Sequence, residues 1–405
     1  MKEKTNHSFE YLVNRRKFLQ LGGLASVSAY LSIKFNDAGL LAKNLSGMLE
    51  KPKTNINDAL KHTRTKYSLP GLYPGKVVKV TNDEMINEDK LNIAEIEKSF
   101  EKGLTSLTGK DLAESFNLLF EKNDIIGIKV NPVGPGRIST HLELVEIVIE
   151  WLKSNGVKSE NIIIWDRFDY MLKDAGFTED RFKGVGIEGL QTMDESAQEG
   201  KTDDNSKWLD KDGYHISRNN YDMDYFYWAD VEAPQDLAYL NQHVFNDKFS
   251  YFGKLITKKL TKIINIPVFK NTGNGISMAT KNLGYGSICN TGRLHKPLFF
   301  DVCTEVLAFP VIRDKLVLNI TDGIRGQYDG GPDANTKFIY NYNTLFFATD
   351  PFALDMVCHN LLVEKRKSMN VKVNEHPIFT DYLRYAEKLR LGITDLSKIE
   401  LIEKN

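Results

Sequence analysis

A run of basic and amide side chains follows one buried strand in the middle of the chain. The strand is apolar and largely β-branched at 263–268 (IINIPV), as in a parallel strand that is covered on both faces. The residues that follow are rich in lysine, asparagine, arginine and histidine, with glycines between them. In open α/β sheets, ligands bind beyond the carboxyl ends of the strands, where glycines let backbone N–H groups approach an anion. The stretch therefore predicts a ligand site.

The side chains in and near this stretch suit a small anionic ligand and a proton transfer. Lysine, arginine and asparagine bind carboxylate, phosphate or sulfate groups. The candidates for this binding are Asn131, Asn271, Lys281, Asn290 and Arg293. Lys270 or His295 can exchange a proton beside a carbonyl if burial adjusts its pKa. We therefore expect Lys270 and His295 to be catalytic acid/base groups.

Three aspartates add carboxylates to the candidate site. Asp166, Asp322 and Asp329 offer the hard oxygen ligands that a divalent cation prefers. Asp322 can equally act as a catalytic base together with Lys270 or His295. These residues do not identify a cofactor, and a divalent metal is one candidate.

Five predicted strands end on a polar residue, namely Asn131, Asp166, Lys270, Asp322 and Asp350. Parallel strands place their carboxyl ends at one edge of the sheet, so these side chains are expected to line one crevice. The alternative is that Asp and Asn cap the following helices or form turns. For Asp350, which precedes a proline at a helix start, capping is favoured.

Strand and helix patterns alternate along most of the chain. Strands are expected at 76–80, 125–130, 162–165, 263–268, 316–320 and 345–348, and helices at 93–104, 112–120, from 140, at 251–260, from 301 to about 310 and at 353–363. The rhythm predicts an α/β fold, a mostly parallel sheet with helices on both faces. We expect a single domain at 70–405, preceded by a linker at 35–69. An irregular insertion, rich in aromatic and acidic residues, interrupts it at about 186–250.

Residues 1–34 resemble a twin-arginine export signal. Arg15 and Arg16 precede the apolar segment FLQLGGLASVSAYLSI, which ends at Lys34. The segment is shorter than the ~20 residues of a membrane-spanning helix. We therefore expect folded export to the periplasm by the twin-arginine machinery. Membrane contact is expected through this segment alone, if it is not cleaved.

Composition excludes several classes of function. The 53 basic and 54 acidic residues nearly cancel, so the chain has no electrostatic signature of nucleic-acid binding. Cys289, Cys303 and Cys358 are widely spaced without a CxxC pair, which excludes a cysteine-ligated iron–sulfur cluster or a four-cysteine zinc site within this chain. No HExxH, GxSxG, Walker loop or GxGxxG occurs in its proper context.

Several longer segments together resemble a known family. They are GLYPGKVVKV, DIIGIKVN, IIIWDRF, VFKNTGNGISMATKNLGYGSICNTGRLH, PVIRDKLVLNITDGIRGQYDGGP and FFATDPFALD. This set is similar to the twin-arginine-exported branch of the domain of unknown function 362 family, over nearly all of the chain after Leu69. The family pattern falls on Lys270, Lys281, Asn282, Asn290, Arg293, His295, Asp322, Gly330, Gly331, Asp350 and Asp355.

The resemblance implies a fold and a site but no established reaction. It also implies a distant likeness to the amino-terminal domain of lactate racemase, which moves a proton or hydride at a hydroxy-acid carbon. Many relatives carry ferredoxin-type cysteine clusters, which this chain lacks. We expect an enzyme that acts on a small anionic substrate, like a hydroxy acid or a sugar acid, by acid/base chemistry. The alternatives are a non-catalytic periplasmic ligand-binding or maturation factor, and a redox protein with an exogenous cofactor.

Overall fold

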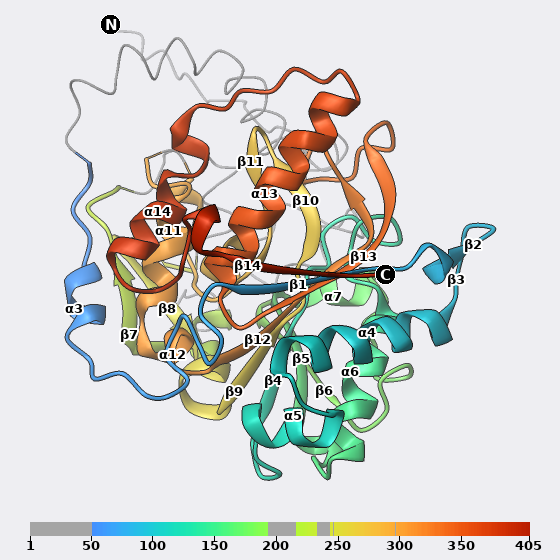
Figure 1. Ribbon diagram of the computed structural model, residues 1–405. Coiled ribbons are helices and arrows are strands. Elements are labelled where there is room, and N and C mark those ends of the chain that lie inside the picture. Colours follow the sequence, from blue (N-terminus) through green and yellow to red (C-terminus); the bar gives the residue numbers. More distant parts are fainter. Residues whose placement is uncertain (1–50, 193–215, 233–243, 246, 296) are drawn as a thin grey trace, which may run out of the picture.

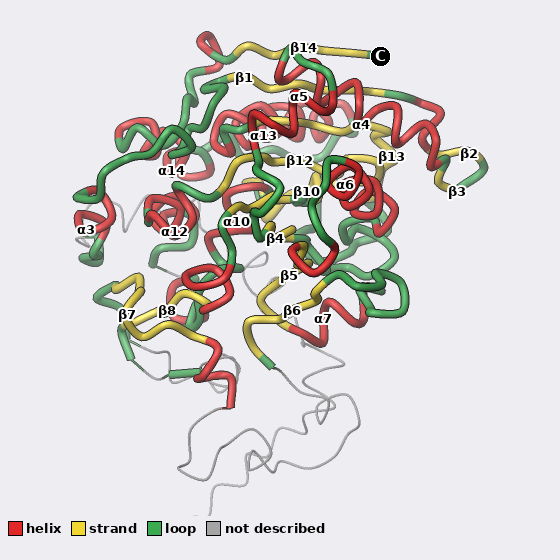
Figure 2. Tube along the Cα trace, turned by 90° about the horizontal axis from the view of Figure 1, so that it is seen from below, coloured by secondary structure: helices red, strands yellow, loops and turns green. Residues whose placement is uncertain are grey.

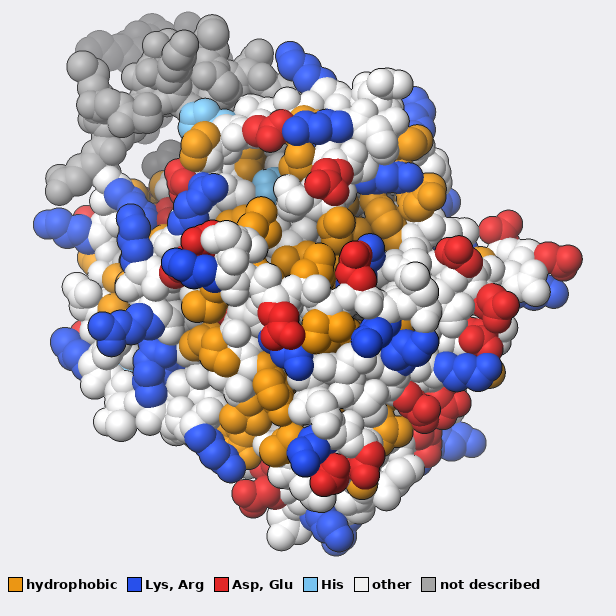
Figure 3. All heavy atoms as spheres, viewed as in Figure 1, with side chains coloured by type: hydrophobic (Ala, Val, Ile, Leu, Met, Phe, Trp, Pro, Cys, Tyr) orange, Lys and Arg blue, Asp and Glu red, His pale blue; other side chains and the backbone are white. Residues whose placement is uncertain are grey.

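The computed structural model describes residues 51–192, 216–232, 244–245, 247–295 and 297–405. The predicted export signal at 1–34 and the most hydrophilic part of the predicted insertion lie outside these residues. Among the described helices, none is long and apolar enough to span a membrane. Figure 3 shows basic and acidic side chains interspersed over one face of the molecule, as a formal net charge of −1 would suggest.

A ten-stranded sheet forms the centre of the molecule, and its main path runs β14-β1-β13-β12-β9-β4-β5-β6. Figure 2 shows this path from β14 and β1 at the top to β6 at the bottom. The strands are β1 (Lys76–Thr81), β4 (Ile126–Lys129), β5 (Ile162–Phe168), β6 (Gly186–Gln191), β9 (Lys262–Asn265), β10 (Val268–Thr272), β11 (Gly275–Ile276), β12 (Leu316–Gln327), β13 (Ile339–Ala348) and β14 (Glu400–Lys404). The neighbours β12, β9, β4, β5 and β6 are parallel throughout. The predicted mostly parallel sheet is therefore confirmed.

Helices cover both faces of this sheet because strand side chains alternate between two hydrophobic cores. In β5, Ile162 and Ile164 belong to one core, and Ile163 and Trp165 belong to the other. The first core contains α4 (Ile93–Thr108), α5 (Leu112–Leu119) and α6 (Leu142–Ser154). The opposite face carries α10 (Ala279–Gly284), α11 (Asp301–Glu305), α12 (Pro310–Arg313), α13 (Pro351–Ser368) and α14 (Asp381–Lys388). Figure 1 shows α4, α5 and α6 on one side of the strands, with α11, α13 and α14 on the other.

The structure differs from the expected elements in four places. A helix was expected at 251–260, but β8 (Phe249–Gly253) pairs with β7 (Tyr221–Trp228) in a separate sheet, and a π-helix follows at Leu255–Lys259. The aromatic rings of Phe226 and Phe249 meet across this pair, with centroids 4.9 Å apart, which favours the strand.

The other three differences concern two prolines and the direction of one strand. Pro267 separates β9 from β10, where one strand was expected. Pro310 begins α12 rather than ending a helix, since its missing N–H costs nothing at the first helical position. Strand β13 is antiparallel to both β12 and β1.

Short elements complete the described chain: α3 (Ile56–Leu60), α7 (Asp169–Asp174) after β5, and the hairpin of β2 (Ile86–Asn87) and β3 (Lys90–Leu91). The described part of the predicted linker, residues 51–69, packs on the domain. The buried Arg313 guanidinium donates to the backbone oxygens of His62 (3.3 Å) and Thr63 (2.9 Å). Leu69 is buried in the core.

Candidate functional site

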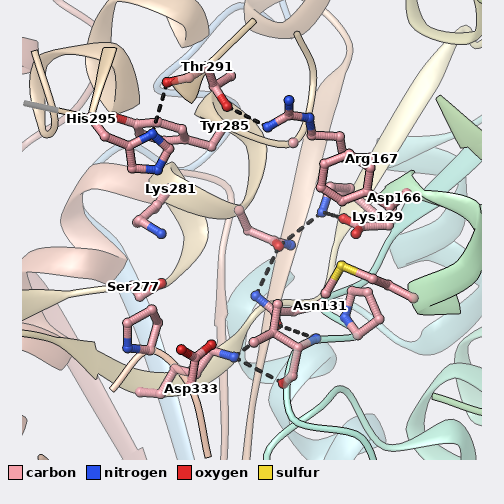
Figure 4. Close-up of a pocket in the computed structure, with 18 residues that line it drawn as sticks. Lys129, Asn131, Asp166, Arg167, Ser277, Lys281, Tyr285, Thr291, His295 and Asp333 are labelled. Atoms are coloured by element: carbon pink, nitrogen blue, oxygen red, sulfur yellow. Dashed lines mark hydrogen bonds and ion pairs between the residues drawn. The ribbon is translucent and has the colours of Figure 1, made fainter. Parts of the chain in front are cut away.

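A pocket of about 160 Å³ opens beyond the carboxyl ends of β4, β5 and β10 (Figure 4). Its polar lining residues are Lys129, Asn131, Asp166, Arg167, Lys270, Ser277, Lys281, Asn282, Thr291, His295 and Asp333. Strands β4 and β5 are hydrogen-bonded neighbours, and β10 extends the sheet beside β12, so their ends converge. The pocket therefore lies at the edge of the sheet where ligands of α/β proteins bind.

Lys129 and Asp166 form an ion pair at the base of the pocket. The Lys129 side chain is 1% exposed, and that of Asp166 is 10% exposed. The Lys129 ammonium also donates to the Val130 carbonyl oxygen (2.7 Å) and to Asn282 Oδ1 (3.0 Å). Gly286 leaves room for it, because a Cβ there would lie 2.5 Å from Lys129 Cε. The pair is thus enclosed and hydrogen-bonded, and its two charges cancel.

Lys270 is a fully buried lysine whose amino group faces the same pocket. Its Nζ donates to Asn131 Oδ1 (2.9 Å) and to the Val133 carbonyl oxygen (3.2 Å). Burial lowers the pKa of Lys270 to about 7, although the Asp333 carboxylate acts against this shift. The positive charge of Lys281 lowers the pKa further. Lys270 can therefore gain or lose a proton near neutral pH, as a catalytic acid or base must.

Lys281 and Arg167 bring further positive charge to the pocket. Among the described residues, the Lys281 amino group has no hydrogen-bond or ion-pair partner, and it lies 5.4 Å from the centroid of the Tyr285 ring. The Arg167 guanidinium donates to Thr291 Oγ1 and lies 4.6 Å from the centroid of the Phe168 ring. Aromatic faces favour a nearby cation. The two side chains are suited to bind an anion.

His295 is held as a neutral imidazole. Its Nδ1 lies 2.9 Å from the Thr291 carbonyl oxygen. Because a carbonyl oxygen accepts and cannot donate, Nδ1 carries the hydrogen and Nε2 carries the lone pair. Burial, together with the charge of Lys281, lowers the pKa of His295 to about 3. The imidazole therefore stays uncharged at neutral pH and can accept a hydrogen bond at Nε2.

Asp333 is the second carboxylate of the pocket. Its Oδ2 is buried and accepts no hydrogen bond from the described residues. Among the described lining residues, Lys129 neutralises Asp166, which leaves one carboxylate, Asp333, and the two cations Arg167 and Lys281. The pocket therefore carries net positive charge, which Lys270 increases when it is protonated.

The structure brings five of the residues predicted from the sequence together in this pocket: Asn131, Asp166, Lys270, Lys281 and His295. It places Arg293 and Asn290 elsewhere, against the β7–β8 region. The Arg293 guanidinium donates to the backbone oxygens of Ala229 (3.0 Å) and Val231 (3.1 Å). Asn290 Oδ1 accepts from the backbone N–H of Val244 (3.0 Å). Neither side chain lines the pocket, and both hydrogen-bond to the backbone.

Asn271 and Asp350 also satisfy the backbone outside the pocket. Asn271 Nδ2 donates to the Gly273 carbonyl oxygen (2.8 Å), and its Oδ1 accepts from the N–H of Gly331 (3.0 Å). Asp350 caps α13 by accepting from Phe352 and Ala353, both at 3.0 Å. Asp350 is therefore a helix cap, as the alternative interpretation predicted. Of the five strand-end residues, Asn131, Asp166 and Lys270 line the pocket.

The three aspartates predicted as metal ligands form three separate ion pairs. Asp166 pairs with Lys129, and Asp329 pairs with Arg366. Asp322 lies 2.8 Å from His141 Nδ1 and accepts from the His141 N–H (2.7 Å). Among the described residues, no group of three or more His, Cys, Asp or Glu side chains is placed to hold a metal ion. The predicted metal set is therefore not assembled in this structure.

Five residues that line the pocket were not predicted from the sequence, namely Lys129, Arg167, Ser277, Thr291 and Asp333. For two of them, the sequence contains a feature that could have identified them. Lys129 and Arg167 are basic residues inside the apolar strands DIIGIKV and IIIWDRF, and a charge in a buried strand requires a partner or a function. Asp333 and Thr291 reach the pocket through loops, and their positions depend on tertiary structure.

The part of the chain that matches a protein-family model includes the whole pocket. A model of a domain of unknown function (DUF362) matches residues 126–360, which is more than half of the chain. Every residue that lines the pocket falls within the matched range. No curated protein matches the chain.

Proposed function

The chain belongs to the DUF362 family, whose description assigns no reaction, and we propose, from the residues of its pocket, that it is an enzyme that acts on small organic anions. It transfers a proton at a carbon next to a carbonyl or hydroxyl group. The observation that carries this proposal is Lys270, a buried amine with a pKa of about 7, in a cavity with two cationic side chains. Perturbed pKa values in a cavity are typical of catalytic groups.

The pocket's charge and size support a small acid as the substrate. Lys281 and Arg167 are the anion-binding cations, in place of the Arg293 and Lys281 pair expected from the sequence. At about 160 Å³, the cavity is smaller than the ~300–1,000 Å³ of pockets for drug-sized ligands. A hydroxy acid or short sugar acid is therefore the proposed substrate class.

The remaining polar groups have roles that follow from their protonation. Lys270 near its pKa accepts a proton in its neutral form and returns it in its charged form. His295, neutral and hydrogen-bonded through Nδ1 to Thr291, presents Nε2 as an acceptor for a substrate hydroxyl group. Its low pKa makes it a hydrogen-bond acceptor rather than a base.

The test is hydrogen–deuterium exchange on carbon, which needs no knowledge of the product. Lactate, glycerate and pyruvate are each incubated with the protein in D₂O, and loss of the C–H signal is followed by proton NMR. Exchange is expected with the wild type for at least one acid and not with Lys270→Met, provided that the melting temperature shows both to be folded.

Lys315→Met is the matched control. Lys315 is a partly buried lysine whose pKa burial lowers to about 8, but its Nζ donates to the backbone oxygens of Ile256 (2.6 Å) and Leu260 (2.7 Å), outside the pocket. This variant should retain exchange. Exchange that survives in Lys270→Met would overturn the assignment. Binding of these acids without any exchange would favour the alternative, a non-catalytic ligand-binding protein.

We also propose that the enzyme is exported folded to the periplasm. The support is the Arg15–Arg16 pair before a short apolar segment, which is typical of twin-arginine signals. A preformed pocket inside one α/β domain is consistent with a protein that is active after folding.

A further inference from the structure

We propose that Lys270 is also a nucleophile, which forms a reversible imine with the carbonyl carbon of a small 2-oxo acid. This inference rests on the proposed function, since it requires an organic anion in the same pocket. It names the substrate class more closely: the reacting carbon belongs to a ketone or aldehyde beside a carboxylate.

Two hydrogen bonds engage both hydrogens of the neutral Lys270 amine and leave its lone pair for the reaction. Nζ donates to Asn131 Oδ1 and to the Val133 carbonyl oxygen. Asn131 Nδ2 donates in turn to Asn282 Oδ1 (3.3 Å), which fixes the Asn131 amide with its oxygen towards Lys270. Both partners of Lys270 are therefore acceptors, and the neutral amine uses both its hydrogens on them. The lone pair takes the third position, where it can attack a carbonyl carbon.

The surroundings of Lys270 keep a large fraction of it neutral. With a pKa of about 7, roughly half of the amines are unprotonated at pH 7, against ~1 in 3,000 for an ordinary lysine. Lys281 is the neighbouring cation that favours this state. A buried amine next to a second cationic group is the arrangement that activates lysine as a nucleophile.

Burial lowers the pKa of Lys281, as it does that of Lys270, but aromatic rings next to Lys281 favour its charged form. Its ammonium lies 5.4 Å and 5.6 Å from the ring centroids of Tyr285 and Phe299, whose faces favour a cation. It therefore serves to bind the carboxylate, together with Arg167, while Lys270 reacts with the carbonyl group. A 2-oxo acid carries these two groups on adjacent carbons, in a molecule small enough for the pocket.

The proposed step is balanced by the groups present. The Lys270 lone pair forms a C–N bond, and the C=O π electrons move to oxygen, which takes a proton to give a carbinolamine. Loss of this oxygen as water, with the second proton of the amine, leaves the C=N bond of the imine. Asp333, whose Oδ2 is buried without a hydrogen-bond donor among the described residues, lines the pocket as a group that can carry these protons.

The experiment is reductive trapping with pyruvate. The full-length protein is incubated with pyruvate and sodium cyanoborohydride, which reduces an imine to a stable secondary amine. Intact mass and peptide mapping are expected to show one carboxyethyl group, located on Lys270. Lys315 is the internal control, because it has a lowered pKa but lies outside the pocket. Lys270→Arg keeps a cation at the position and should lose the adduct.

The outcomes separate this inference from the proposed function. Labelling of Lys270 in preference to Lys315 and to exposed lysines supports the imine. Absence of a Lys270 adduct, or equal labelling of Lys315, overturns it. If carbon–deuterium exchange still depends on Lys270 in that case, the proton-transfer function stands without the imine. If exchange is independent of Lys270 but the adduct forms, the imine stands and the role of Lys270 as the proton-transfer group fails.

Discussion

The enclosed Lys129–Asp166 pair gives the sharpest stability prediction. Lys129→Met keeps the length of the side chain and removes its charge. The change leaves the Asp166 carboxylate, 10% exposed, without its cation, and it deprives Val130 and Asn282 of a donor. Breaking a buried ion pair by removing one partner costs ~3–5 kcal/mol, because the other charge is left uncompensated. We expect a loss of that size in the free energy of unfolding.

The assay is urea unfolding of a double-mutant cycle: wild type, Lys129→Met, Asp166→Asn and the double variant. The double variant removes both charges, so no unpaired ion remains. It should therefore lose less stability than the sum of the two single variants, by at least ~2 kcal/mol. The control is Lys61→Met, since the Lys61–Asp58 pair has a similar distance (2.8 Å) but side chains that are 74% and 58% exposed. Its expected effect is ~0–1 kcal/mol.

Two results would refute this reasoning. A loss in Lys129→Met no larger than that in Lys61→Met would mean that the Lys129–Asp166 pair is solvated in solution. Additive single variants would mean that the two side chains do not interact, which contradicts their direct contact in the structure. Equal slopes of free energy against urea are needed for either comparison, since a changed slope indicates a changed unfolded state.

Two further predictions concern pH and export. The pKa of Lys270 is about 7 in the folded protein and ~10.4 in the unfolded chain. Between pH 7 and pH ~10.4, Lys270 therefore takes up a proton when the protein unfolds. The free energy of unfolding rises with pH over this range, by ~1.4 kcal/mol per pH unit. Urea unfolding at pH 7 and at pH 9 measures this increase in the free energy of unfolding. The increase should be larger in the wild type than in Lys270→Met, and equal increases would contradict the lowered pKa. Replacing Arg15 and Arg16 by lysine should retain the protein in the cytoplasm of its native host, as fractionation would show. A periplasmic variant would contradict export by this route.

The fold was predictable from the sequence because the strands are long apolar runs between amphipathic helices. The runs at 125–130 and 162–165 became β4 and β5, and the helix pattern at 93–104 became α4. What the sequence did not predict is pairing at a distance. Strand β13 pairs antiparallel with both β12 and β1, and β1 lies more than two hundred residues earlier in the chain.

The position of the site was partly predictable for the same reason. Asn131, Asp166 and Lys270 end strands whose carboxyl ends meet at one edge, so the rule of parallel sheets brought them together. Asp322 also lies in a sheet strand, but His141, from another segment, pairs with it. Sequence position alone does not distinguish a strand end that lines a pocket from one that pairs with another segment.

A basic residue inside a buried strand is a second indicator of the site, besides polar residues after strands. Polar residues after strands serve turns and caps, as Asp350 does, because every chain must satisfy its backbone there. Lys129 and Arg167 instead replace apolar side chains within strands, and burial of a cation is costly unless a partner compensates it. In Lys129 the compensation is the ion pair with Asp166. Arg167 also lines the pocket, where its guanidinium donates to Thr291 Oγ1.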